Sequence, residues 1–321
     1  MEKQLHNRIA ESQLTIYVCA IFSIVTWIVA GLLTKQLWIQ LASMFITCYL
    51  MIEMSRHLIL LRIRSWMVTS TFMMLTACCG FTYPSISTGI LSLCAAFSMF
   101  MLFLTYQNPT DVGHTYYAYL SLGVASLFLV QTIYVFPLVW VLSRFLLQTF
   151  NWRTWVISLL GLITPYWFAL PWFIYQQDYD SIIAHFQPLV EFHRPEEGLQ
   201  PIQLVFFAFV GLLTIIGAIH FWRESYKERI RTRQLYTFIL WAGLAVSLVI
   251  ILQPQHYNTL IRVVLVCLCP FIAHFFTLSQ SKITKYLFFG VLAIVILLSF
   301  ITINESLLDS TNTFLSQLWN G

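Results

Sequence analysis

The sequence predicts an all-α fold, a polytopic bundle of about eleven transmembrane helices that forms a single integral membrane domain. Of the 321 residues, 59% are hydrophobic and only 9% are charged. Soluble domains carry roughly 25% charged residues, and a single soluble core stops growing near roughly 250–300 residues. The apolar residues also gather in runs of about twenty, which is the length that a helix needs to cross a bilayer. The chain therefore requires a membrane.

Ten apolar segments are clear candidate spans. The first follows Lys3 and Arg8 and has no small-residue cleavage site, so we expect it to be retained and not removed as a signal peptide. In chain order the ten segments are 14–33, 37–54, 65–83, 86–105, 115–134, 154–176, 203–222, 235–252, 259–279 and 284–303. Pro137, Pro165, Pro171 and Pro270 are expected to break or kink helices beside a cavity. We expect this cavity to face outward, with walls from the outer end of span 154–176, the loop 177–200 and the start of span 259–279.

The segment 135–150 is the eleventh candidate, although Pro137 and Arg144 both count against it. Lys and Arg concentrate in cytoplasmic loops, so their distribution tests whether this segment crosses. With the N-terminus inside and the segment crossing, thirteen of the seventeen Lys and Arg residues fall inside and two outside. Without the crossing, the basic loop 222–234 moves outside and the asymmetry disappears. We therefore predict eleven spans, with the N-terminus inside and the C-terminus outside.

Two loops stand out in this topology. The outer loop 177–200 is acidic, and the spacing of its apolar residues between Ile182 and Phe192 predicts an amphipathic helix on the membrane surface. Its carboxylates Asp178, Asp180 and Glu191 are the weak candidates for catalytic acids, although a solvated loop is the simpler explanation for them. The basic loop 222–234 lies inside and could dock a protein partner or anionic lipid.

The candidate ligand-binding residues are arginines and tryptophans near span ends. Arg262 stands close to His256 without an acid nearby, a setting that suits a phosphate or carboxylate. Arg144 could bind a ligand too, or extend to the cytoplasmic headgroups. Trp167 and Trp172 could stack on sugars or pack against lipid. An interfacial anchor is the simpler alternative for each of the four.

Other polar residues have local structural explanations. Glu53 and Arg56 have the spacing of a helical ion pair, and Asp111 is placed to cap the following helix. The seven cysteines lie in apolar runs without metal-ligand spacing, so we expect buried packing residues and no metal site. His220 and His274 are interpreted as packed histidines. No nucleotide-binding glycine loop, HExxH or GxSxG motif occurs, so we expect no cofactor. The formal net charge of +4 is too small to suggest a nucleic-acid partner.

The block 119–175, with Gly161 and Pro165 in "GLITPYW", resembles the central part of GT-C class membrane glycosyltransferases. The stretch 257–270, with Arg262 and Pro270, is similar to the late arginine–proline span of such enzymes. That class keeps its catalytic acid in a large first outer loop, whereas only residues 34–36 join the first two spans here. The resemblance therefore implies a non-catalytic relative, or one that uses the acidic loop 177–200.

The whole chain also resembles a set of polytopic membrane proteins of unassigned function from Bacteroidota, which implies a bacterial inner membrane. Together these observations predict a protein that binds or processes a lipid-linked glycan or envelope lipid at the outer leaflet. Its expected partners are membrane lipids, including a polyprenyl-phosphate or glycolipid. A transporter or a non-enzymatic membrane scaffold is the alternative, and whether the protein is an enzyme is left open.

Overall fold

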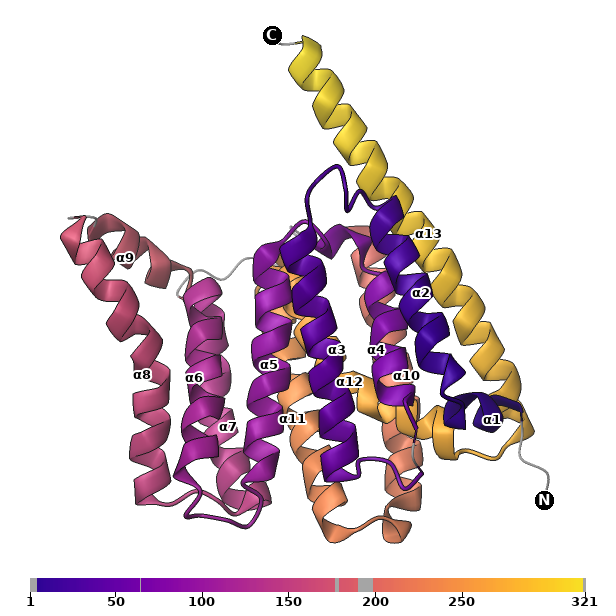
Figure 1. Ribbon diagram of the computed structural model, residues 1–321, viewed down its shortest axis with the longest axis horizontal. Helices are drawn as coiled ribbons and strands as arrows, with labels where there is room; N and C mark the ends of the chain where they lie inside the picture. The colour runs from indigo at the N-terminus through magenta and orange to yellow at the C-terminus, as the bar shows by residue number, and fades with distance from the viewer. Residues whose placement is uncertain (1–4, 64, 177–178, 190–198, 320–321) are drawn as a thin grey trace.

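A computed structural model describes residues 5–63, 65–176, 179–189 and 199–319, and this part of the chain forms helices without any strand. The long helices stand side by side in one bundle (Figure 1). In chain order the α-helices are α1 (Leu5–Glu11), α2 (Leu14–Val29), α3 (Trp38–Leu58), α4 (Met67–Ala77), α5 (Ile86–Leu104), α6 (Val112–Phe128), α7 (Phe136–Leu142), α8 (Trp152–Tyr175), α9 (Tyr179–Phe186), α10 (Pro201–Glu224), α11 (Ile230–Leu252), α12 (Tyr257–Leu278) and α13 (Lys282–Trp319). The predicted all-α fold is confirmed.

The architecture is that of a multi-pass membrane protein. Within the described residues, eight helical segments are long and apolar enough to cross a membrane. The shorter apolar helices α2 and α4, and the 17-residue α6, occupy the other three predicted spans. Helix α1 lies at the lower end of the bundle in Figure 1, and α13 ends beyond its upper end. This arrangement agrees with an odd number of crossings, while eleven spans and their orientation stay predictions.

The eleventh candidate segment is helical, but it begins earlier than predicted. A membrane-length segment extends over Val130–Leu147, and α6 ends at Phe128 instead of continuing to 134. Leu129 has an extended backbone with φ of −147°, which separates the two helices. Pro137 occupies the first turn of α7, where its missing N–H leaves no helical acceptor unsatisfied. The break lies inside the apolar run "LFLVQTIYVFP" (residues 127–137). Hydropathy does not predict it, because hydropathy reports polarity and not backbone geometry.

Helix α12 forms the centre of the bundle. Its apolar stretch is 89% buried, and it packs against α4, α5, α10 and α11. The close approach of α10 to α12 depends on a glycine. A Cβ on Gly217 of α10 would lie 2.6 Å from the Phe271 carbonyl oxygen of α12. Small residues permit such contacts between membrane helices. Pro270 lies inside α12, and Pro165 and Pro171 lie inside α8, so the expected helix breaks do not occur there.

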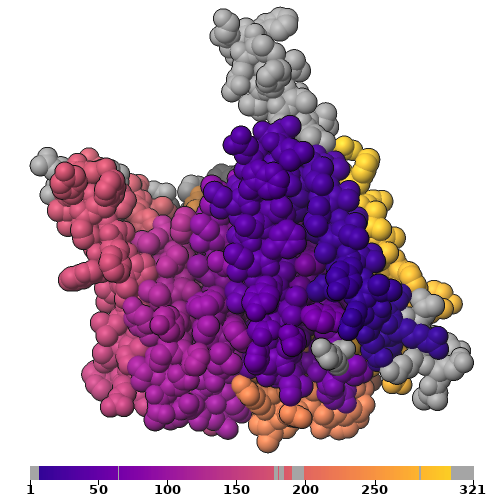
Figure 2. Space-filling model, viewed as in Figure 1, coloured from indigo at the N-terminus to yellow at the C-terminus, as the bar shows by residue number. Residues whose placement is uncertain are grey.

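Helices α8 and α9 stand at one edge of the molecule, away from the face that α2 and α3 cover (Figure 2). The predicted amphipathic helix is described in part, as α9 and a 3₁₀ turn at Gln187–Leu189. The remaining predicted positions up to Phe192 lie outside the described residues.

Several local predictions are confirmed. Asp111 caps α6 by accepting a hydrogen bond from the His114 N–H at 3.2 Å. Glu53 pairs with Arg56 at 3.5 Å. All seven cysteines are buried with free thiols, as expected for packing residues.

Candidate functional site

A polar cavity of about 540 Å³ opens at the end of the bundle that carries loop 222–234, here called the basic end. Its walls come from α1, α10, α12 and the loops that follow α3, α10 and α12. The ionisable side chains that line it are Glu11, Arg62, His220, Glu224 and Lys227. In a chain with 9% charged residues, this concentration identifies the cavity as the candidate site. We call it the polar pocket.

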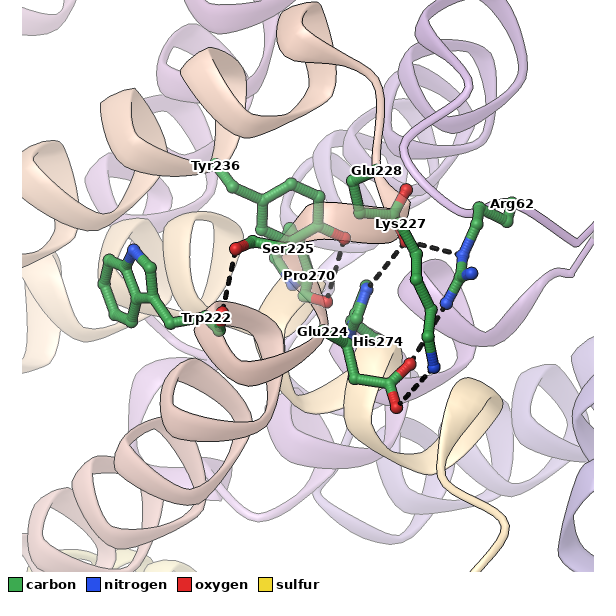
Figure 3. Close-up of polar contacts among 9 residues, drawn as sticks. All are labelled: Arg62, Trp222, Glu224, Ser225, Lys227, Glu228, Tyr236, Pro270 and His274. Atoms are coloured by element: carbon green, nitrogen blue, oxygen red, sulfur yellow. Dashed lines mark hydrogen bonds and ion pairs between the residues drawn. The ribbon is translucent and has the colours of Figure 1, made fainter.

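An ion-pair network borders the polar pocket (Figure 3). Arg62 is its centre: Nε lies 2.7 Å from Glu228 Oε1, and Nη2 lies 3.3 Å from Glu224 Oε2. Lys227 Nζ donates to Glu224 Oε1 at 3.0 Å. His274 Nε2 lies 3.5 Å from the same Glu228 oxygen that Arg62 contacts. Two carboxylates and two permanent cations therefore form one connected group.

The two carboxylates of this network, Glu224 and Glu228, differ in how deeply they are buried. The side chain of Glu228 is 2% exposed, whereas that of Glu224 is 28% exposed and those of Arg62 and Lys227 are more open still. A buried carboxylate is stable only when charges and hydrogen bonds replace the water that it has lost. Arg62 supplies the charge for Glu228, and the fully buried His274 lies beside it. Glu224 and Lys227 thus face the cavity and can exchange partners with a ligand.

The turn between α10 and α11 positions these groups. Residues Ser225–Lys227 form a 3₁₀ turn in which the Ser225 hydroxyl donates to the Trp222 carbonyl oxygen at 2.8 Å. The Glu228 N–H in turn donates to the Ser225 carbonyl at 3.0 Å. Tyr236 of α11 donates to the Pro270 carbonyl of α12 at 3.4 Å, which joins the two helices beside the ion-pair network (Figure 3).

Three buried polar atoms on the wall of the polar pocket have no hydrogen-bond partner among the described residues. They are Asn7 Oδ1 of α1, His220 Nδ1 of α10 and Thr277 Oγ1 of α12. The side chains of Asn7 and Thr277 are almost wholly buried, at 7% and 1% exposed. Buried polar atoms nearly always find partners, and leaving one unsatisfied costs about 1–3 kcal/mol. These atoms are arranged to bind water or a ligand that enters the cavity.

Arg262, the main predicted ligand-binding residue, is enclosed in the core and not in an outer cavity. It is 1% exposed, and its Nε donates to Thr82 Oγ1 at 2.9 Å. Its guanidinium carbon lies 5.5 Å from the ring centre of Trp27 and 5.4 Å from that of Tyr83. These two rings stack at 4.0 Å. Arg262 Nη1 and Nη2 have no partner within the described part of the chain.

The structure does not assemble the other predicted ligand-binding residues around Arg262. His256 precedes the first turn of α12, at the end of the bundle away from the basic end, where its Nε2 lies 2.7 Å from Gln131 Nε2. Arg144 is exposed in the π-helical turn Ser143–Leu147. Trp167 and Trp172 are 73% and 62% exposed on α8, where they face outward. None of these five residues lines a cavity described here.

A second cavity, of about 320 Å³, lies between α6, α8 and α9. Tyr166, Phe173, His185 and Phe186 line it, so its walls include the C-terminal end of α8 and the helix α9 of loop 177–200, two of the three walls that the sequence predicts. The start of α12, also a predicted wall, does not contribute. Burial lowers the pKa of His185 from its ordinary value. Of the candidate acids, Asp180 is exposed on α9, and Asp178 and Glu191 lie outside the described residues.

Sequence reasoning missed the assembly of the polar pocket, because Arg62, Glu228 and His274 are far apart in the chain. One signal was present: Glu224 and Glu228 are the acids of an otherwise basic loop, and acids in such a loop favour specific pairing. His274 is packed as predicted, fully buried against the rings of Phe221 and Tyr236, and no pattern in the sequence indicated that it also lies 3.5 Å from Glu228. Within the described residues, no group of three or more His, Cys, Asp and Glu could hold a metal ion.

Comparison of the chain with protein-family models, with curated proteins and with solved structures found no match.

Proposed function

We propose that this multi-pass membrane protein binds the polar head of a membrane-derived ligand in the polar pocket at its basic end. The observation that carries the proposal is the convergence of three unsatisfied polar atoms, Asn7 Oδ1, His220 Nδ1 and Thr277 Oγ1, on one charged cavity. By the predicted topology this cavity faces the cytoplasm. A ligand that reaches it from the inner leaflet would satisfy these atoms and the exposed sides of Glu224 and Lys227.

Native mass spectrometry tests this proposal. Protein purified in mild detergent from its own membrane should retain a bound species in the wild type. The double variant Asn7→Leu/Thr277→Val removes two unsatisfied polar atoms with little change of shape, so it should fold at least as stably as the wild type. We expect it to lose the bound species.

The matched control is Thr214→Val. Thr214 is buried on α10, and its hydroxyl donates to the Val210 carbonyl at 2.8 Å, away from the polar pocket. This variant should keep the bound species. Retention of the same species by Asn7→Leu/Thr277→Val would exclude the polar pocket as the binding site.

The cavity between α6, α8 and α9 supports a second candidate function, the binding of a lipid-linked glycan or other envelope lipid at the outer leaflet. Its aromatic side chains Tyr166, Phe173 and Phe186 suit a sugar face or an isoprenoid chain. Arg262 is buried in the core and cannot reach the phosphate of a ligand in this cavity. The hypothesis of a GT-C-like site therefore lacks the arginine that the sequence assigned to it. Amide variants of Asp178, Asp180 and Glu191 test whether any catalysis occurs in this region.

Under either candidate function we place the chain in a bacterial inner membrane. The arginines of loop 222–234 extend the positive surface around the polar pocket. They would attract anionic lipid or an acidic protein partner in the scaffold alternative, and charge reversal of residues 223–233 tests that role.

A further inference from the structure

A second large cavity, of about 440 Å³, lies among α1, α2, α4, α10, α12 and α13. Among the described residues that line it, none is charged and none also lines the polar pocket. Its wall consists mostly of aliphatic, methionine and phenylalanine side chains, and we call it the apolar cavity. Ligand sites between helices have volumes of about 300–1,000 Å³, mostly apolar walls and a few polar groups that orient the ligand. The apolar cavity has the size and lining of such a site.

The exposure of its lining residues places the mouth of the apolar cavity between α2 and α13, which lie side by side (Figure 1). Val18 of α2 is 64% exposed and Leu292 of α13 is 37% exposed, whereas Leu75 and Phe276 on the inner wall are buried. The lining residues of α13 lie inside its candidate span Ile283–Asn304. The mouth therefore faces hydrocarbon, and a molecule dissolved in the bilayer can enter without crossing the head groups.

The inner wall of the apolar cavity carries a hydroxyl group without an acceptor. Ser70 of α4 is 1% exposed, and its Oγ has no hydrogen-bond partner among the described residues. The Cys19 thiol of α2 lies beside it, but a thiol is only a weak donor and acceptor. Thr15 and Thr71, which also line the cavity, donate to backbone carbonyl oxygens. The Ser70 hydroxyl is thus available to a ligand.

A ligand of the apolar cavity must be uncharged and must carry a hydrogen-bond acceptor. A charged group would lose its water without meeting a counter-charge on the wall. A phospholipid acyl chain suits the apolar walls, but it is pure hydrocarbon at this depth and leaves the Ser70 hydroxyl unsatisfied. A carbonyl oxygen on an otherwise apolar molecule accepts that hydrogen bond and adds no charge.

The wall of the apolar cavity also suits a flat ring. Phe288 packs edge-to-face against Phe276 and Phe289, with ring centres 5.3 Å and 5.6 Å apart, and all three side chains line the cavity. Aromatic rings prefer such edge-to-face or offset neighbours. Met67 and Met74 add sulfur atoms, which make favourable contacts with rings. A ring beside Ser70 would therefore find aromatic and sulfur neighbours.

We propose that the apolar cavity binds an isoprenoid quinone, a membrane-dissolved molecule that combines a flat ring, carbonyl acceptors and a long apolar tail. One ring carbonyl accepts a hydrogen bond from the Ser70 hydroxyl. The ring packs against Phe276, Phe288 and Phe289, and the tail leaves between α2 and α13 into the bilayer. This inference does not depend on the proposed function of the polar pocket.

Binding of duroquinone and durene tests the requirement for a carbonyl acceptor. The two probes have the same methylated six-membered ring, but only duroquinone has carbonyl oxygens, and its full substitution prevents addition of a thiol such as Cys19. Binding to protein in nanodiscs is measured relative to the concentration of each probe in empty nanodiscs. We expect duroquinone to bind at least about fivefold more tightly than durene, as one hydrogen bond warrants. Equal binding would overturn the inference.

Ser70→Ala tests the donor. It removes an unsatisfied hydroxyl, so it should fold as stably as the wild type. We expect duroquinone to bind about fivefold more weakly and durene to bind as before. Ser92→Ala is the matched control, because Ser92 is equally buried on α5 outside the cavity and donates to the Gly89 carbonyl at 2.9 Å. Unchanged duroquinone binding in Ser70→Ala would contradict the assignment.

The natural occupant tests the class of ligand directly. Organic extraction of protein purified in mild detergent should yield isoprenoid quinone at a ratio near that of one bound molecule per chain. Leu292→Trp narrows the mouth and should lower this ratio at least about fivefold. Val25→Trp is the control, because Val25 is an exposed residue of α2 outside the cavity. Phospholipid without quinone in the wild type, or an unchanged quinone ratio in Leu292→Trp, would overturn the inference.

Discussion

Arg262 is the residue whose surroundings differ most from those expected of a ligand-binding arginine. Its guanidinium is buried beside the stacked rings of Trp27 and Tyr83 and has one hydrogen bond, from Nε to Thr82. The ring faces attract the cation and offset part of its desolvation. No carboxylate pairs with it in the described residues. Shape and ring contact, more than charge pairing, hold this side chain in place.

Replacement of Arg262 by methionine should therefore leave the protein folded. A buried charge can be exchanged for an apolar side chain of similar volume at little cost in stability. Arg262→Ala should lower the free energy of unfolding by about 2–5 kcal/mol, because it leaves a cavity. Thermal unfolding in detergent measures both variants. Failure of Arg262→Met to fold would show that the charge itself is required.

Arg62 and Glu228 should behave in the opposite way, as a coupled pair. Arg62→Met leaves the buried Glu228 carboxylate without its main partner, so we expect a loss of about 3–5 kcal/mol in the free energy of unfolding. Adding Glu228→Gln should restore most of this stability, since the uncompensated charge is gone. Arg56→Met is the control, because its pair with Glu53 is exposed and worth less than about 1 kcal/mol. Additive effects of the Arg62 and Glu228 variants would contradict the pairing.

At the scale of elements, α6 and α8 meet through two glycines. A Cβ on Gly161 would lie 2.8 Å from the Tyr116 carbonyl oxygen, and one on Gly123 would lie 2.7 Å from the Leu162 carbonyl oxygen. Both obstacles are backbone atoms, which cannot rotate away as a side chain can. The contact between these helices therefore depends on the absence of side chains at both positions.

Gly161→Ala should separate α6 from α8 and lower the free energy of unfolding by about 1–3 kcal/mol. Gly211→Ala on α10 is the control, because a Cβ there meets nothing within 4 Å. Alanine in an open helical position is favoured by about 0.5–1 kcal/mol over glycine. Equal stability of the two variants, measured by chemical or thermal unfolding, would show that the α6–α8 contact is looser than the structure describes.

The sequence predicts the existence of elements better than their ends. Each predicted span contains a helix, because some twenty apolar residues leave the backbone no better way to satisfy its hydrogen bonds in lipid. The ends at Phe128 and Ala77 were missed, because α6 and α4 stop inside continuous apolar runs. Those breaks depend on backbone angles and on tertiary packing, which hydropathy does not report.

At the scale of the whole molecule, the candidate site is a property of the tertiary structure. The contact of Arg62 with Glu228, and that of Glu228 with His274, join loops and helices that no local pattern relates. Sequence reasoning therefore found charged residues one at a time and assigned most weight to Arg262, whose hydrogen bond from Nε joins it to Thr82 in the core. It did identify the end of the bundle where positive charge collects, and the polar pocket lies there.

The predicted orientation places the polar pocket in the cytoplasm, and fluorescent fusions can test it. Green fluorescent protein folds and fluoresces when it stays in the bacterial cytoplasm but not after export through the general secretory route. A fusion before Met1 should fluoresce, and one after Gly321 should be dark although the fusion protein is present in the membrane. Fluorescence from both fusions would indicate an even number of crossings and would remove Val130–Leu147 from the set of spans.

The burial of all seven thiols has a practical consequence for spectroscopy. A maleimide dye or a nitroxide reagent needs an accessible thiolate, so the native chain should remain almost unlabelled. A single cysteine introduced at an exposed position, such as Tyr226 or Trp152, then becomes the only attachment point without removal of the native ones. Distances between pairs of such labels, with and without added lipid, would report whether the bundle changes shape when it takes up its ligand.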